Sequence, residues 1–166
     1  MSHRAPSALL ALALGGLCST VEASDRISSA EAGRLAIEQM ERFKAHAREL
    51  PPAGVPWFEF LDAPGDVLVT APHATAQMRE GKLKGSDLGT GPLAVVLHHM
   101  AGVPVLYTTW ASPSDPNYYD ENPFKERLAG LIRDRKPKLV LDLHASRSDR
   151  PYDVDLGTLW GASLLG

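Results

Sequence analysis

Cysteine is almost absent from this chain of 166 residues, because Cys18 is the only one. Cys18 lies within residues 1–23, which have the pattern of a secretory signal peptide, so the mature chain would contain no cysteine. A disulfide framework, a cysteine nucleophile and a zinc–thiolate site are therefore excluded for that chain. Any metal ion would have to be held by histidines and carboxylates.

An excess of one charge is also missing. The 17 basic and 20 acidic residues leave a net charge of −3, which gives no electrostatic footprint for nucleic acid or for an anionic membrane surface. We therefore expect no nucleic-acid partner. The nucleophile-elbow motif G-x-S-x-G, the P-loop and the dinucleotide motif G-x-G-x-x-G are all absent, which argues against a serine hydrolase or a nucleotide-binding protein of those types.

The chain lacks an apolar run long enough to span a bilayer. Its longest candidate, ALLALALGGL at residues 8–17, is preceded by His3 and Arg4 and followed by the small-x-small pattern Val21-Glu22-Ala23. This order predicts a signal peptide over residues 1–23, and the alternative is an amphipathic or disordered tail. We expect a periplasmic or secreted protein with no stable membrane insertion after cleavage.

Helix signals dominate the segment that follows. Ser28 and Glu31 match the S-x-x-E capping box, and apolar side chains recur at helical spacing to about Glu49, where Pro51-Pro52 stops the helix. Residues 24–56 are accordingly interpreted as an N-terminal helix and linker.

Residues 57–166 alternate between strand and helix patterns. The expected strands are 66–71, 103–108 and 138–143, and the expected helices are 92–101 and 123–136. Residues 57–61 form either a further short strand or a segment that only covers the core. This alternation predicts an α/β domain with a mainly parallel or mixed sheet flanked by helices, of the phosphorylase/hydrolase-like type. We expect a buried strand at 138–143 and two long polar loops, at 75–89 and at 109–122.

Histidines stand at two of the strand exits. His73 follows the strand 66–71, and His144 follows 138–143 with Asp142 two residues before it, on the same face of the strand. Ligands of open α/β sheets bind at the carboxyl ends of the strands, and imidazole is the commonest metal ligand. A metal site is therefore one interpretation, with Asp142 either a ligand or a carboxylate that orients His144. The other is two unrelated histidines that each satisfy a local hydrogen bond.

The loop after His73 offers further candidates. Glu80 or Asp87 could supply a third ligand, since a catalytic zinc ion takes three protein ligands and leaves one position open. Arg79, with Lys82 and Lys84, could hold a substrate carboxylate. The alternative for each is a solvated loop charge.

Three stretches resemble the N-formylglutamate amidohydrolase family. They are VLVTAPHATAQMREGKLKGSDLGTGPLAVVL, then DENPFKERL, and finally LVLDLHAS, and the resemblance covers about residues 64–166. The family is related to zinc carboxypeptidases and to aspartoacylase-like deacylases. The resemblance implies an α/β sheet with a zinc site at its strand ends.

Residue by residue, the resemblance implies that His73 and His144 are metal ligands. It implies Asp87 as the carboxylate ligand, with Glu80 as the alternative. The H-x-x-E pattern of carboxypeptidases is absent, because this chain has Ala76 at the position of the Glu. By the same analogy Arg79 and Arg147 are candidates for binding a substrate carboxylate. Relatives carry a catalytic Glu late in the chain, and this sequence ends before such a residue, so we expect a domain truncated at its C-terminus with Glu80 as a possible catalytic residue.

The resulting expectation is an extracytoplasmic zinc-dependent amidohydrolase that cleaves a small N-acyl amino acid or a peptide amide by metal-activated water. The alternative is a non-catalytic or truncated member of the same fold that acts as a binding module.

Overall fold

The computed structural model describes residues 26–158 and 162–164. The predicted signal peptide, residues 1–23, lies outside these described residues. Within them, no helix has both the length and the apolar character needed to cross a membrane.

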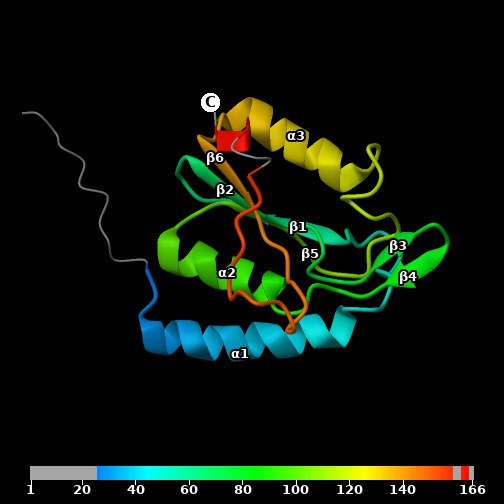
Figure 1. Ribbon diagram of the computed structural model, residues 1–166, viewed down its shortest axis with the longest axis horizontal. Coiled ribbons are helices and arrows are strands. Elements are labelled where there is room, and N and C mark those ends of the chain that lie inside the picture. Colours follow the sequence, from blue (N-terminus) through cyan, green and yellow to red (C-terminus); the bar gives the residue numbers. More distant parts are fainter. Residues whose placement is uncertain (1–25, 159–161, 165–166) are drawn as a thin grey trace, which may run out of the picture.

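A four-stranded mixed sheet forms the centre of the molecule, in the order β1-β5-β2-β6 (Figure 1). Its strands are β1 (Phe58–Leu61), β2 (Val67–Ala71), β5 (Val105–Thr108) and β6 (Leu139–Asp142). β2 runs parallel to both β5 and β6, and only β1 is antiparallel to its neighbour. The predicted α/β class with a mixed, mainly parallel sheet is therefore confirmed.

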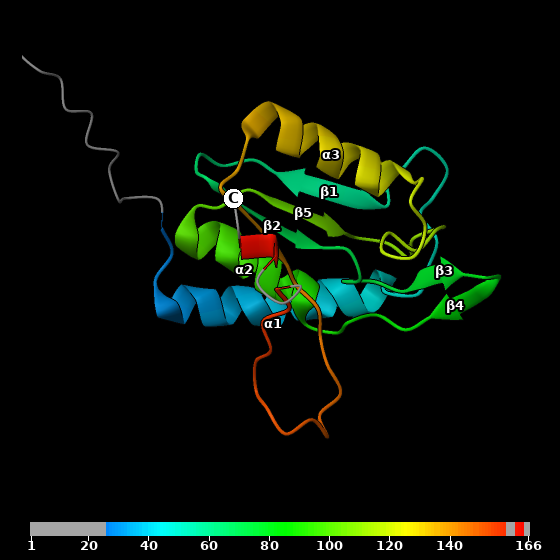
Figure 2. The same cartoon turned by 45° about the horizontal axis from the view of Figure 1, so that its top comes forward.

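In the described part of the chain, three helices cover the two faces of the sheet. Figures 1 and 2 show α1 (Ser29–His46) and α2 (Thr90–Ala101) on one face and α3 (Pro123–Arg135) on the other. The predicted capping box is present at α1, where Ser28 and Glu31 bond reciprocally. α3 begins with proline at its first position, and the side chain of Asn122 accepts a hydrogen bond from the backbone N–H of Lys125. A short 3₁₀ turn, Ala162–Leu164, is the last described element.

The core is split by the sheet into two apolar layers. Because successive strand residues point to opposite faces, Val69 of β2 faces α1 and α2, whereas Leu68 faces α3. Phe43 of α1 is buried in the first layer, and Phe124 of α3 is buried in the second. The N-terminal helix thus packs as an integral part of the core.

A β-hairpin stands where the sequence predicted only a polar loop. β3 (Gln77–Arg79) pairs antiparallel with β4 (Lys82–Lys84). The connecting residues, Glu80 and Gly81, have φ of 52° and 71°, the two positive values that a tight two-residue hairpin turn requires. Strands of three residues leave too little alternation for a pattern to be recognised, which explains the error.

The prediction that 138–143 forms a buried strand is wrong in one respect. β6 is a strand, but it lies at the edge of the sheet, and Leu139 is 43% exposed and Val140 is 37% exposed. The apolar run predicted burial because it matches a central parallel strand. Its position in the sheet, which the sequence pattern does not contain, decides otherwise.

Candidate metal centre

His73, Asp87 and His144 come together at one edge of the sheet. One ligand atom from each of them lies within 4.8 Å of the others, which is close enough for all three to hold a single metal ion. His73 follows β2 and His144 follows β6, and these two strands are parallel neighbours, so their carboxyl ends meet. The structure therefore supports a possible metal-binding group made of two imidazoles and one carboxylate.

Backbone contacts place Asp87 beside the two histidines. The N–H of Asp87 donates to the carbonyl oxygen of His73 at 2.7 Å. The carbonyl oxygen of Asp87 in turn accepts from the side-chain hydroxyl of Thr90, in the first turn of α2, at 2.8 Å. Asp87 is thus fixed between the exit of β2 and the start of α2.

The carboxylate of Asp87 is the meeting point of the two rings. Its Oδ2 lies 2.8 Å from Nδ1 of His144 and 3.6 Å from Nδ1 of His73. The ring centroids of the two histidines are 5.0 Å apart. Both Nδ1 atoms therefore face the same point, and they are the atoms that would bind a metal ion together with Asp87.

A second carboxylate contacts Nε2 of each histidine, the ring nitrogen that does not face Asp87. Nε2 of His73 lies 2.9 Å from Oδ1 of Asp115, and Nε2 of His144 lies 3.1 Å from Oδ2 of Asp142. The other oxygen of Asp142 accepts from the hydroxyl of Thr70 on β2. A carboxylate on the outer nitrogen fixes the ring and its tautomer, so the inner nitrogen is free to act as a ligand. The expectation that Asp142 and His144 point the same way is confirmed.

Asp115 is the site residue that the sequence did not reveal. It is fully buried in the loop after β5, and Arg79 contacts its Oδ2 through both Nε at 2.7 Å and a terminal nitrogen at 2.6 Å. The backbone N–H groups of Asn117 and Tyr118 donate to its Oδ1. The signal that could have found it is an acid in a long strand-exit loop, the same signal that marked the candidates after His73.

The acid–imidazole contacts shift the pKa values of the group. Burial raises the pKa of Asp87, but hydrogen bonds from His144 and His73 outweigh it and hold the pKa well below its usual range. Hydrogen bonds to Asp142 and Asp87 raise the pKa of His144 to about 10. For His73, burial lowers the pKa, but bonds to Asp87 and Asp115 raise it above its ordinary value. Without a metal, the carboxylates of Asp142 and Asp87 therefore favour the protonated form of His144.

The other predicted site residues lie outside this group. The guanidinium of Arg79 forms an ion pair with Asp115 and lies over the ring of Tyr118. The carboxylate of Glu80, in the hairpin turn, accepts from the hydroxyl of Tyr118 at 2.7 Å. Arg147 is exposed and paired with Asp149, and within residues 26–158 no hydrogen bond or ion pair joins it to the metal-binding group. Their roles in catalysis and substrate binding stay predictions.

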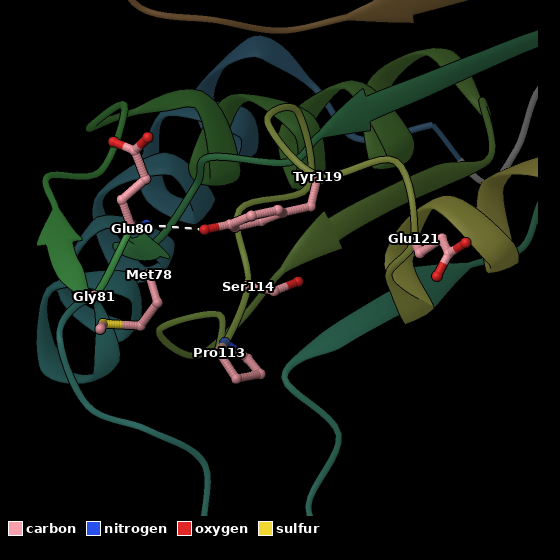
Figure 3. A pocket seen from close by; sticks show the side chains of 7 residues that line it. All are labelled: Met78, Glu80, Gly81, Pro113, Ser114, Tyr119 and Glu121. Carbon is pink, nitrogen blue, oxygen red and sulfur yellow. Dashed lines mark hydrogen bonds between the residues drawn. The ribbon is translucent and has the colours of Figure 1, made fainter.

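An open pocket of about 420 Å³ lies between the hairpin and the loop after β5 (Figure 3). The hydroxyl of Tyr119 accepts from the backbone N–H of Glu80 at 2.9 Å across this pocket. Its remaining lining residues are Met78, Gly81, Pro113, Ser114 and Glu121. Neither His73, Asp87, Asp115 nor His144 is among the residues that line this pocket.

Replacing Asp115 by asparagine is expected to lower zinc affinity about 10–100-fold, the usual effect of removing an outer carboxylate from a ligand histidine. Titration with a competing chelator measures the change. Asp120→Asn is the matched control, because Asp120 is a fully exposed acid of the same loop. Equal affinities for the two variants would show that Asp115 does not position His73 for a metal.

Metal uptake at pH 7 is expected to release protons, because His144, with a pKa of about 10, is protonated in the metal-free chain and must lose that proton to bind. The raised pKa also means that the imidazolium stabilises the metal-free fold below about pH 6.5, and this stabilisation is lost as the pH rises toward 10. Calorimetry in two buffers of different ionisation enthalpy counts the protons. Asp142→Asn should reduce the release, and zinc binding without any proton release would contradict the assignment.

Comparison of the chain with protein-family models, with curated proteins and with solved structures gave no match. The resemblance to N-formylglutamate amidohydrolases, and the zinc ion that it implies, therefore remain predictions. What the structure does establish is the grouping of His73, Asp87 and His144 at the strand ends.

Proposed function

We propose that this protein is an extracytoplasmic zinc-dependent amidohydrolase that acts on a small N-acyl amino acid or a peptide amide. One observation carries the proposal: two imidazoles and a carboxylate converge at the ends of parallel strands, with Nδ1 of each ring toward Asp87. The resemblance of the surrounding sequence to N-formylglutamate amidohydrolases supports the reaction type. The extracytoplasmic location rests on the signal-peptide pattern of residues 1–23.

The donor set fits zinc. Two histidines and one carboxylate are the ligands of many catalytic zinc sites, which keep a fourth position for water or substrate. His144 is the more exposed of the two histidines, so solvent reaches the group from the side of His144. When bound, zinc supplies a Lewis acid that polarises the amide carbonyl and lowers the pKa of a water molecule.

The chain's own residues then orient the ligands and the substrate. Asp115 and Asp142 hold the outer nitrogens of His73 and His144, which keeps both rings directed at Asp87. Nδ2 of Asn117 lies 2.9 Å from Nε2 of His144, so this exposed amide adjoins the outer nitrogen that Asp142 also contacts. Glu80 is the candidate for transferring a proton to the leaving amine.

Assays with N-formyl and N-acetyl amino acids and short peptides test the proposal, with and without added zinc. We expect amine release that requires zinc and that is lost in Asp87→Asn. If Glu80 is the proton-transferring group, Glu80→Gln should lower the rate about 10²–10⁴-fold while zinc binding is unchanged. A chain that binds zinc but hydrolyses none of these substrates would contradict the amidohydrolase proposal.

A non-catalytic binding module is the second candidate, and the partners of the acids favour it. Among the described residues, Asp87 contacts both histidines, Asp115 and Asp142 each hold one of them, and Glu80 binds Tyr118. None of these carboxylates stands free beside the centre as a general base. Zinc-dependent retention of a peptide without its cleavage would support this function.

A further inference from the structure

Arg79 is linked to the metal-binding group through the carboxylate of Asp115. Nε of Arg79 lies 2.7 Å from Oδ2 of Asp115, and one of its terminal nitrogens lies 2.6 Å from the same oxygen. Oδ1, the other oxygen of Asp115, lies 2.9 Å from Nε2 of His73. A single carboxylate therefore joins Arg79 to one of the two histidines that face Asp87.

The burial of Asp115 makes its contact with Arg79 important. The side chain of Asp115 is fully buried, and a buried carboxylate is costly unless charged and hydrogen-bonding partners surround it. Its Oδ1 contacts His73 and accepts from the backbone N–H groups of Asn117 and Tyr118. Among the described residues, Arg79 is the one group that binds Oδ2. Arg79 thus fixes the rotation of the carboxylate, and with it the direction in which Oδ1 meets His73.

The contacts of Arg79 favour a role inside the protein over the binding of a substrate carboxylate. Two of its three guanidinium nitrogens bind Asp115, and its central carbon lies 4.8 Å from the centre of the Tyr118 ring. The side chain of Arg79 is 31% exposed. An arginine binds a carboxylate most strongly through two parallel N–H groups, and Arg79 already directs Nε and a terminal nitrogen at Asp115.

The β3–β4 hairpin is attached to the loop after β5, which keeps Arg79 within reach of Asp115. The N–H of Asp115 donates to the carbonyl oxygen of Met78 at 2.9 Å. The N–H of Glu80, in the hairpin turn, donates to the hydroxyl of Tyr119 at 2.9 Å (Figure 3). The residues on both sides of Arg79 are therefore bound to the same loop that carries Asp115.

We infer that Arg79 is a positioning residue of the metal centre, which orients His73 through Asp115 and does not bind the substrate. This role rests on the proposed function, because it presupposes that His73 binds a metal ion. With Oδ2 held by Arg79, Oδ1 of Asp115 accepts from Nε2 of His73 and directs Nδ1 toward Asp87. The hairpin that carries Arg79 is then part of the structure that supports the centre.

Arg79→Met tests this role in the full chain, with zinc affinity measured by competition with a chelator. We expect the affinity to fall roughly tenfold, at the lower end of the range for outer partners of ligand histidines. Loss of a positive charge by itself would favour a divalent cation, so a fall in affinity reports lost orientation. Arg133→Met is the matched control, because Arg133 is an exposed arginine of α3 that pairs with Asp134. An Arg79→Met chain that binds zinc as tightly as the control would overturn the inference.

A double variant shows whether Arg79 acts through Asp115. Arg79→Met should lower zinc affinity in the wild-type chain but should lower it no further in an Asp115→Asn chain, because the carboxylate that Arg79 orients is already absent there. Equal losses in the two backgrounds would overturn the inference, since they would show that Arg79 affects the centre only through the general stability of the fold.

Arg79→Lys is the variant to measure if circular dichroism shows that Arg79→Met does not fold. Lysine keeps a positive charge for the buried carboxylate but offers one nitrogen where arginine offers two, so we expect a zinc affinity about threefold below that of the wild type. A folded Arg79→Lys chain with wild-type affinity would then overturn the inference.

Zinc affinity separates this inference from the proposed reaction, because it is measured without catalysis. A wild-type chain that binds zinc and cleaves no amide, with Arg79→Met binding zinc more weakly, would contradict the amidohydrolase proposal and support the role of Arg79. A wild-type chain that binds no zinc would overturn both.

Discussion

Asp87→Asn is expected to lower zinc affinity by at least about 100-fold, the largest effect of any single substitution at the site. Even the outer partners of ligand histidines contribute about 10–100-fold, and among the described residues Asp87 is the one group that faces Nδ1 of both rings. The substitution keeps the side-chain shape and removes the charge that the metal and the two imidazoles share. Competition with a zinc chelator measures the loss.

Asp149→Asn is the matched control for this substitution. Asp149 is an exposed acid that pairs with Arg147 in the loop after β6, outside the metal-binding group. Circular dichroism of both variants checks that each is folded. If Asp87→Asn binds zinc as tightly as Asp149→Asn does, Asp87 is not a ligand, and the alternative carboxylate, Glu80, becomes the residue to test.

Gly91→Ala is expected to destabilise the fold by about 1–3 kcal/mol, because α1 and α2 cross too closely at this point to admit a side chain. A β-carbon on Gly91 would lie 2.2 Å from Cε1 of Phe43 and 2.8 Å from the β-carbon of Ala74. Phe43 is buried in the core, so its ring cannot move without displacing its neighbours. Urea denaturation of the metal-free chain gives the difference in the free energy of unfolding.

The same substitution at Gly130 should have the opposite sign. Gly130 lies within α3, where the nearest atom to an added β-carbon is the guanidinium of Arg133 at 3.7 Å. Alanine there removes backbone freedom from the unfolded chain at no steric cost, and should stabilise the protein by about 0.5–1 kcal/mol. If the Gly91→Ala variant unfolds at the same urea concentration as the wild type, α1 does not pack on α2 as described.

The elements that the sequence predicted well are those with strong local signals. The capping box at Ser28 and Glu31 placed the start of α1, and Pro123 placed the start of α3. The alternation of strands and helices gave the α/β class. These features depend on a few neighbouring residues, so they can be recognised without knowledge of the tertiary structure.

Features that depend on position in the fold could not be predicted in the same way. The exposure of Leu139 and Val140 follows from the place of β6 at the sheet edge, which its composition does not encode. The β3–β4 hairpin depends on pairing between strands of only three residues each.

The metal-binding group was partly predictable. His73 and His144 were found because strand exits are where α/β sheets bind ligands, and that edge is set by the chain direction alone. Choosing between Asp87 and Glu80 needed the structure, which places Asp87 between the rings and Glu80 in the hairpin turn. Asp115 was missed because nothing local distinguishes it from the other acids of the strand-exit loops, and only the fold shows its contact with His73.

The most direct test of the central claim is the zinc content of the purified chain, measured beside a His73→Ala, His144→Ala double variant. Both proteins would be equilibrated with zinc and dialysed against zinc-free buffer, with circular dichroism to confirm that each is folded. We predict about one zinc ion per wild-type chain and none in the double variant, because the variant lacks both Nδ1 ligands. A folded wild-type chain that retains no zinc, or a double variant that retains as much as the wild type, would contradict the account.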